Sequence, residues 1–194
     1  KFFQVVTYLP HFISIMVMCG MILIFLSPKN GLFANILRLF DVQMPNILGI
    51  PQAFSSIYVW SDVWQNMGWD SIIYLAALSG IDPTYYEAAV IDGATKWQKI
   101  RYIDIPLLLP TAMILLILRS GSTLSVGFEK VFLLQNQLNL NVSEVISTYV
   151  YKMGLVNSQY SLSTAISLFN TVINLVVLLG VNKLSKKLTE TSLL

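Results

Sequence analysis

Residues Asp82 to Pro110 read DPTYYEAAVIDGATKWQKIRYIDIPLLLP, a pattern that predicts two short helices joined by a tight corner. Asp82 followed by proline is typical of a helix start, because a carboxylate caps free backbone N–H groups and proline needs no donor there. Gly93 predicts the corner, since glycine adopts the positive φ at which many helices end. A second helix is expected from about Thr95, and Pro106 is expected to mark the turn into the apolar run that follows.

On both sides of this segment the chain is strongly apolar. Its 194 residues are 55% hydrophobic and only 11% charged, with a mean hydropathy of +0.67, whereas soluble domains carry about 25% charged residues. A helix that crosses a bilayer needs about 20 mostly apolar residues. Four stretches qualify, at about residues 8–27, 55–79, 107–127 and 162–184. We therefore predict an all-α polytopic membrane protein with four transmembrane helices.

Basic residues predict the orientation of these helices. The segment between the second and third stretches and the C-terminal tail each hold three basic residues, namely Lys96, Lys99 and Arg101, and Lys183, Lys186 and Lys187. Lysine and arginine accumulate in cytoplasmic loops of membrane proteins. The loop at 82–110 and the C-terminus are therefore expected in the cytoplasm.

Several functions are excluded by composition. A net charge of +2 gives no basic field for nucleic acid. Cys19 and His11 are the single cysteine and the single histidine, so no internal disulfide and no Cys/His metal site is expected. The sequence has no nucleophile beside a base, no zinc-protease motif and no glycine-rich phosphate loop. We therefore expect no enzyme activity in this chain.

Polar residues within the apolar stretches are candidates for a solute path. Asp62, Asn66 and Asp70 recur every four residues and so share one helix face. A rise of 1.5 Å per residue places both Asp62 and Arg119 about 10 Å below the outer membrane surface, where the two could meet. These residues either bind solute hydroxyls or form an ion pair that fixes packing, and both interpretations stay open. Trp69 either stacks on a sugar ring or belongs to an interfacial aromatic belt.

The 82–110 segment also resembles a known motif. Its residues Glu87-Ala88-Ala89, Asp92-Gly93-Ala94, Ile103, Pro106 and Pro110 resemble the EAA loop of binding-protein-dependent (type I) ABC importers. Gly93 follows Ala89 after three residues and Ile103 follows Gly93 after nine, as in that motif. The resemblance covers essentially the whole chain, including YLPHFIS, SDVWQNMGWDSIIYLAAL and GFEKVFLL, and is greatest to sugar permeases of the maltose-transporter class, in the branch that imports oligosaccharides and polysaccharide fragments.

The resemblance implies a MetI-like ABC permease fold. Such permeases have six membrane-spanning helices, with the EAA loop between the fourth and fifth. The chain begins at Lys1 rather than methionine, so we expect one N-terminally truncated permease domain, residues 1–194, holding helices three to six and the coupling loop at 82–110.

The resemblance also implies a mechanism and partners. The EAA helix would insert into a cleft of an ATP-binding subunit, which holds ATP and magnesium, so this chain itself would bind no cofactor. A second permease subunit would complete a heterodimer in the bacterial plasma membrane, and an extracellular solute-binding lipoprotein would deliver the solute to it. The expected ATPase-coupling residues are Tyr86, Glu87, Ala88, Ala89, Asp92, Gly93, Ala94, Pro106 and Pro110. The expected solute-path residues are Asp62, Asn66, Trp69, Asp70 and Arg119.

An oligosaccharide is the expected solute, on the strength of the resemblance. The same architecture importing an amino acid, a peptide or an anion is the first alternative. A channel or secondary transporter that needs no ATPase is a second, and it predicts that Glu87 is dispensable.

Overall fold

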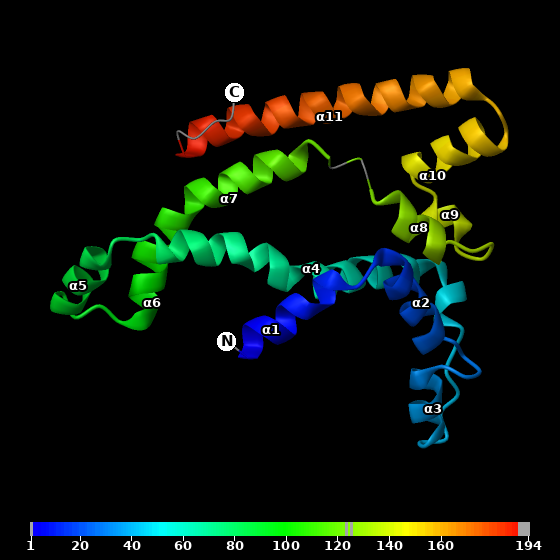
Figure 1. Cartoon of the computed structure of the whole chain (residues 1–194), viewed down its shortest axis with the longest axis horizontal. Coiled ribbons are helices and arrows are strands. Elements are labelled where there is room, and N and C mark those ends of the chain that lie inside the picture. The colour runs from blue at the N-terminus through cyan, green and yellow to red at the C-terminus, as the bar shows by residue number, and fades with distance from the viewer. Residues whose placement is uncertain (1, 123, 125, 190–194) are drawn as a thin grey trace. The chain divides into compact units, whose positions relative to one another are not determined.

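The computed structural model describes residues 2–122, 124 and 126–189, and within these ranges the chain forms helices and turns without a strand (Figure 1). The predicted all-α class is therefore confirmed. The helices are α1 (Phe2–Tyr8), η1 (Leu9–Phe12), α2 (Ile15–Phe25), α3 (Leu32–Arg38), η2 (Ile47–Gly49), α4 (Pro51–Ser79), α5 (Pro83–Ile91), α6 (Lys96–Lys99), η3 (Ile100–Asp104), α7 (Ile105–Ser120), α8 (Phe128–Leu134), α9 (Leu140–Ser143), α10 (Ile146–Tyr151), η4 (Lys152–Val156) and α11 (Tyr160–Thr189).

The chain divides into two compact units. Unit 1 comprises residues 1–69 and 124–168, and unit 2 comprises residues 70–123 and 169–194. The core of unit 1 forms where α2 and the beginning of α4 pack against α8, with the buried side chains Cys19, Phe54, Val131 and Leu134 at its centre. These residues are apolar, so their burial is the main favourable contribution to the packing of unit 1.

The first predicted membrane helix, at 8–27, is wrong as a continuous helix. The chain bends by 96° between η1 and α2. Pro10 lacks an N–H, and the Ser14 side chain accepts from the Val17 N–H to start α2 as a new helix. The carbonyl of Ile13, exposed by the break, accepts a 2.7 Å hydrogen bond from the side chain of Gln65 on α4. This bond satisfies a backbone group that the bend would otherwise leave without a partner.

Glycine lets α1 and α4 approach each other closely beside this bend. Gly68 is buried in α4, and a Cβ atom at its position would overlap the backbone carbonyl of Thr7 in α1. Any larger residue at position 68 would therefore force the two backbones apart.

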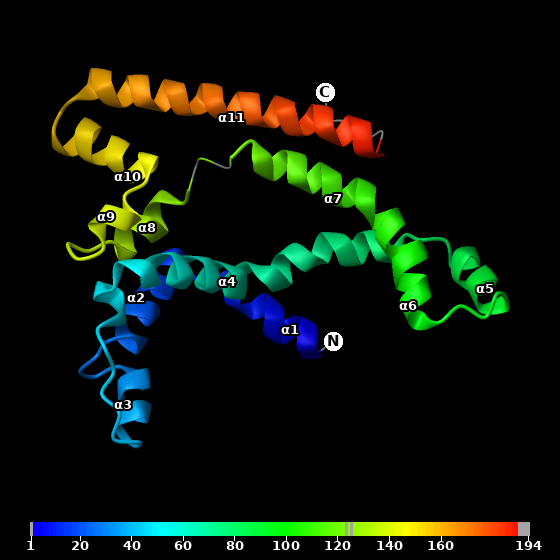
Figure 2. The ribbon, with the colours of Figure 1, turned by 180° about the vertical axis from the view of Figure 1, so that it is seen from behind.

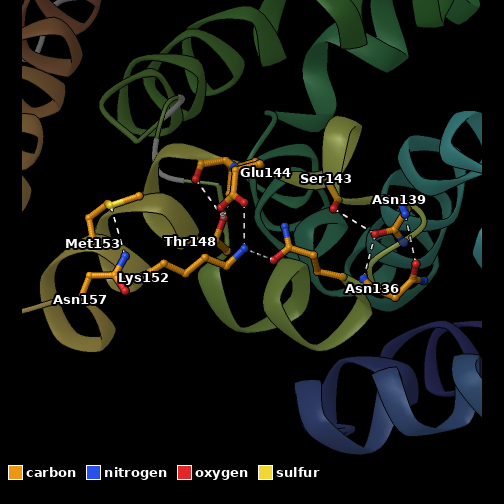
Figure 3. Close-up of polar contacts among 10 residues, drawn as sticks. Asn136, Asn139, Ser143, Glu144, Thr148, Lys152, Met153 and Asn157 are labelled. Atoms are coloured by element: carbon orange, nitrogen blue, oxygen red, sulfur yellow. Dashed lines mark hydrogen bonds and ion pairs between the residues drawn. The ribbon is translucent and has the colours of Figure 1, made fainter.

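Side-chain hydrogen bonds order the segment between α8 and η4 in unit 1 (Figure 3). The ammonium of Lys152 lies 2.8 Å from both Glu144 Oε2 and Gln135 Oε1, and Thr148 Oγ1 donates to Glu144 Oε1 at 2.9 Å. Asn139 lies in the same segment and donates to the Leu134 carbonyl at 3.2 Å. Short helices joined by such turns depend on these polar contacts, because each is too short to be stable by itself.

In unit 2 a single helix runs from Lys96 to Ser120 through α6, η3 and α7. The predicted turn at Pro106 is therefore wrong, as is the predicted beginning of the third stretch at 107. In η3 the helix widens to π geometry, with the Ile105 N–H donating to the Ile100 carbonyl. Such a bulge accommodates the N–H that Pro106 lacks, so the helix continues instead of ending.

The end of α7 lies beside α11 within unit 2. A Cβ atom at Gly121, the residue that ends α7, would come within 2.8 Å of the Leu178 side chain on α11. The third stretch was predicted to end at 127, but α7 ends at Ser120. Two residues of the predicted range, 123 and 125, lie outside the described part of the chain.

Two helices in the described ranges are long and apolar enough to cross a membrane, Lys96–Ser120 and Tyr160–Lys187, and a third is obtained if the bent pair at 2–25 counts as one. The prediction at 162–184 is confirmed in α11. The prediction at 55–79 is confirmed as a helix, α4, which at 29 residues is about 43 Å long. Because of its polar residues, α4 is not among the helices that are apolar enough to cross a membrane. Length and composition therefore identify two or three of the four predicted membrane helices.

Replacing Glu144 with glutamine is expected to loosen the α8–η4 segment, because both side chains of its pair with Lys152 are less than one third exposed and loss of the pair costs about 1–2 kcal/mol. Backbone hydrogen exchange in α10 should become about tenfold faster. Glu129→Gln is the matched control, since Glu129 is exposed in α8 of the same segment. Equal exchange in the two variants would contradict the assignment.

Candidate functional site

The short helix α5 begins as its sequence predicts. The Asp82 carboxylate accepts a 2.9 Å hydrogen bond from the Thr84 N–H, and Pro83 occupies the first position of the helix. That bond holds the pKa of Asp82 below its usual value, because it stabilises the charged carboxylate. The cap thus fixes where α5 begins after the end of α4.

The other end of α5 depends on a glycine. Gly93 has φ of +70°, and its N–H donates to the Val90 carbonyl at 3.0 Å while the Ala94 N–H donates to the Ala89 carbonyl at 2.8 Å. These two bonds form a Schellman motif, which closes a helix C-terminus with a left-handed residue. The predicted corner at Gly93 is confirmed.

The next helix begins three residues later. Thr95 and Gln98 form a capping box, in which the Thr95 hydroxyl accepts from the Gln98 N–H and the Gln98 side chain accepts from the Thr95 N–H. The chain therefore leaves α5 and enters α6 through a corner defined at both ends by hydrogen bonds (Figures 1 and 2).

No residue of α5 is buried in the structure. Glu87 and Ala88 are exposed, and a groove of about 560 Å³ lies between α5 and α6, with lining residues that include Ala88, Ala89, Asp92, Ala94 and Gln98. Small alanine side chains allow another backbone to approach closely. Both ends of α5 are thus defined by hydrogen bonds, while most of its side chains stay exposed.

Tyr86 joins α5 to the helix that follows. Its hydroxyl donates a 2.6 Å hydrogen bond to Asp104 Oδ1, at the end of η3. This bond raises the pKa of Tyr86, because it stabilises the neutral phenol beside a carboxylate. The structure thus gives Tyr86 a contact within the chain, in addition to its predicted place in the coupling loop.

The remaining predicted coupling residues lie in the helix or its corner. Asp92 and Gly93 are exposed, and Ala94 is half-buried beside the groove. Pro106 and Pro110 lie inside the helix Lys96–Ser120 rather than at a turn. Each removes one backbone donor, so both lie where this helix can bend most easily.

In unit 1 the predicted pairing of Asp62 with Arg119 is wrong. Asp62 Oδ1 lies 3.4 Å from the ammonium of Lys130, which is only 4% exposed and lies 4.8 Å from the centre of the Tyr58 ring. A buried ammonium requires a compensating partner, and a carboxylate and an aromatic face provide it. Asp62 keeps about half of its side chain exposed.

Asn66 and Trp69 contact His11, which sequence analysis did not place near them. His11 Nδ1 lies 3.0 Å from Asn66 Oδ1, and the imidazole stacks on Trp69 with centroids 4.4 Å apart and an interplanar angle of 5°. Asn66 Nδ2 in turn lies 3.3 Å from Asp62 Oδ1. Asp62, Asn66 and Trp69 therefore form one connected polar and aromatic surface in unit 1, which we call the α4 polar surface.

In unit 2 Arg119 pairs with Asp70. The Arg119 Nη2 to Asp70 Oδ2 distance is 2.6 Å, and 70% of the arginine side chain is exposed. The pair borders a pocket of about 370 Å³ that also includes Tyr74. A carboxylate and a guanidinium side by side offer both acceptors and donors to a hydroxyl-bearing ligand.

Three contributing residues were missed from the sequence. These are Lys130, Asp104 and Gln65. The charge of Asp104 in IDIPLLLP was an available signal, because a charge in an apolar run requires a partner, and so was the Glu129-Lys130 pair of charges in GFEKVFLL. Gln65 had no comparable signal, since the bend that it satisfies was not predicted.

Comparison with known proteins identifies a family. Residues 1–190 match the binding-protein-dependent transport system inner membrane component. The chain is 37% identical over 190 residues to the polygalacturonan/rhamnogalacturonan transport system permease protein YteP of Bacillus subtilis, covering 98% of this chain and 59% of YteP. It is 35% identical to protein LplB of the same organism, and this match covers 98% of this chain and 60% of LplB. The chain thus spans less than two thirds of the length of these relatives.

Solved structures agree with the sequence comparison. The chain superposes with a TM-score of 0.94 and 42% identity on a chain of a bacterial ABC transporter involved in the import of the acidic polysaccharide alginate, covering 97% of this chain and 66% of that one. A second structure is that of a bacterial alginate ABC transporter in complex with an alginate pentasaccharide-bound periplasmic protein. On a chain of this structure the TM-score is 0.95 and the identity 42%, and the match covers 100% of this chain and 67% of that one. The predicted MetI-like permease fold is therefore confirmed.

Gly93→Ala is expected to open the corner after α5, because a left-handed φ costs about 1–2 kcal/mol in a residue with a Cβ. No atom lies within 4 Å of the added Cβ, so this backbone cost is the whole effect. Trypsin should cleave after Lys96 about tenfold faster in the variant. Gly80→Ala, where a Cβ meets only ordinary contacts, is the control; unchanged cleavage in Gly93→Ala would contradict the role of the corner.

Proposed function

Since this chain belongs to the family of binding-protein-dependent transport system inner membrane components, we propose that it is a permease subunit of an ATP-driven importer. In this role it forms part of a solute path, and α5 couples the path to an ATPase. The observation that carries the proposal is α5 itself, a capped helix with no buried residue, followed directly by a long apolar helix.

The arrangement of α5 supports the coupling role. Exposed Glu87 provides a carboxylate for an arginine of a partner, and an arginine–carboxylate pair is among the stronger polar contacts. Ala88 and Ala89 leave room for the partner's backbone beside the groove. The corner at Gly93 and the hydrogen bond from Tyr86 to Asp104 together hold this surface to the helix from Lys96.

The partners of this role are two ATP-binding subunits, a second permease subunit and an extracellular solute-binding protein. ATP and magnesium would be held by the ATP-binding subunits, and this chain would bind no cofactor and carry out no hydrolysis. The chain would lie in the bacterial plasma membrane, with the 82–110 loop and the C-terminus in the cytoplasm, where their lysines and arginines favour them.

An oligosaccharide is the solute that we propose. YteP is named for polygalacturonan and rhamnogalacturonan transport, and one solved relative was crystallised with an alginate pentasaccharide-bound periplasmic protein. The α4 polar surface combines a stacked indole with amide and carboxylate groups, which suits the apolar ring faces and the hydroxyls of sugars. The Asp70–Arg119 pair provides the same chemistry in unit 2.

Glu87→Arg is expected to abolish solute-stimulated ATP hydrolysis, because it reverses the charge that α5 presents. The measurement uses the full-length permease, purified with its second permease, ATPase and binding protein, over a panel of oligosaccharides. Stimulation should fall more than tenfold in the variant. Glu129→Arg makes the same charge change in α8, outside the loop, and should keep normal stimulation.

The outcomes of this experiment separate the alternatives. A complex that transports normally with Glu87→Arg would support a channel or secondary transporter and would overturn the coupling role. Stimulation by an amino acid, a peptide or an anion, but by no saccharide, would keep the importer and overturn the oligosaccharide.

A charge exchange distinguishes solute binding from packing at Asp70 and Arg119. Arg119→Asp alone is expected to reduce uptake more than tenfold, and Asp70→Arg combined with it should not restore uptake, since the solute would meet a reversed set of donors and acceptors. Co-purification of the subunits monitors folding. Recovery of uptake in the double variant would assign the pair to helix packing instead.

A further inference from the structure

The connection between α5 and the following helix has an unusual construction. A groove of about 560 Å³ lies between α5 and α6, so the two helices do not pack side chain against side chain along their length. Among the described residues, the side-chain hydrogen bond found between α5 and the helix Lys96–Ser120 is that from Tyr86 to Asp104, at 2.6 Å. This bond therefore joins α5 to the long helix at a second point, in addition to the corner at Gly93.

Asp104 occupies a special position in its own helix. It is the last residue of η3. There the Ile105 N–H donates to the carbonyl of Ile100, five residues earlier, whereas in a regular α-helix it would donate to the carbonyl four residues earlier. Pro106 follows two residues later, so the Tyr102 carbonyl has no donor at the usual spacing. A helix bends most easily where a π-bulge and a proline interrupt its regular hydrogen bonds. Tyr86 therefore contacts the long helix at its most deformable turn.

We propose that Asp104 is a positioning residue that, by holding the Tyr86 hydroxyl, transmits displacement of α5 to the beginning of α7, with η3 as the bend. The inference rests on the proposed function, in which α5 contacts the ATPase. Without the bond, a displaced α5 would pivot about Gly93 and the displacement would not reach α7. With the bond, α5 and the end of η3 move together.

The bond is strong enough for this role. A short hydrogen bond from a phenol to a carboxylate is charge-assisted, and removing one partner of such a bond shifts an equilibrium about tenfold or more. The effect should therefore appear in the efficiency of coupling rather than in the binding of the ATPase, whose contact surface on α5 is unchanged by loss of one hydroxyl.

The test uses the complete transporter in liposomes and measures solute uptake and ATP hydrolysis together with subunit co-purification. Tyr86→Phe and Asp104→Leu should each lower the amount of solute imported per ATP hydrolysed about tenfold, while co-purification stays normal. Tyr160→Phe is the control, because Tyr160 is exposed and lies outside the 82–110 loop, at a site where no described side-chain hydrogen bond is lost.

Two further variants make the result specific to the bond. Asp104→Asn keeps an acceptor oxygen for the Tyr86 hydroxyl and should retain most of the coupling that Asp104→Leu loses. The double variant Tyr86→Phe/Asp104→Leu should be no worse than either single variant, since both remove the same contact.

Other outcomes would overturn one idea or the other. If the wild-type complex couples uptake to hydrolysis and Tyr86→Phe couples equally well, the positioning role is wrong while the proposed function stands. If Tyr86→Phe or Asp104→Leu loses the ATPase on purification, the bond serves assembly and the transmission proposal is wrong. If the wild-type protein binds no ATPase at all, the proposed function itself fails.

Discussion

Proline has no amide hydrogen, yet the helix from Lys96 to Ser120 runs through Pro106 and Pro110 without ending. Its continuity depends on η3, where a π-bulge absorbs the break in the backbone pattern. The arrangement of unit 2 follows from this one accommodation. Because the helix continues, the residues that follow the corner at Gly93 run without a loop into the apolar part of α7, and the bulge beside Pro106 is the place where this helix can bend.

Each of two charged residue pairs beside the apolar helices lies within a single compact unit of the chain. Asp62 is matched by buried Lys130 in unit 1, and Asp70 is matched by Arg119 in unit 2. Each pair leaves the carboxylate partly exposed, so its remaining oxygen is accessible to other groups. Charges that would be too costly alone in a low-dielectric environment thus become tolerable, and they remain chemically available at the same time.

The capped helix α5, the corner at Gly93 and the last long helix could be predicted from the sequence, because each depends on local rules of capping, glycine conformation and hydropathy. The continuous helix through Pro106 could not, since a π-bulge has no sequence signature of its own. The bend at Ile13–Ser14 was missed for a different reason. The carbonyl that it exposes is satisfied by Gln65, 52 residues away in the chain, and the apolar run around the bend reads as an unbroken helix. The partner of Arg119 was misassigned for a third reason. The depth of a residue in the membrane, estimated from helix boundaries that are uncertain by several residues, cannot distinguish Asp62 from Asp70.

That hydrogen bond from Gln65 to Ile13 has a consequence for biogenesis. A backbone carbonyl without a donor costs several kcal/mol in hydrocarbon, and Gln65 is synthesised after the bent segment has already left the ribosome. The N-terminal helices therefore cannot reach their final conformation as an independent insertion unit. The order of synthesis and the order in which this part of the fold is completed therefore differ.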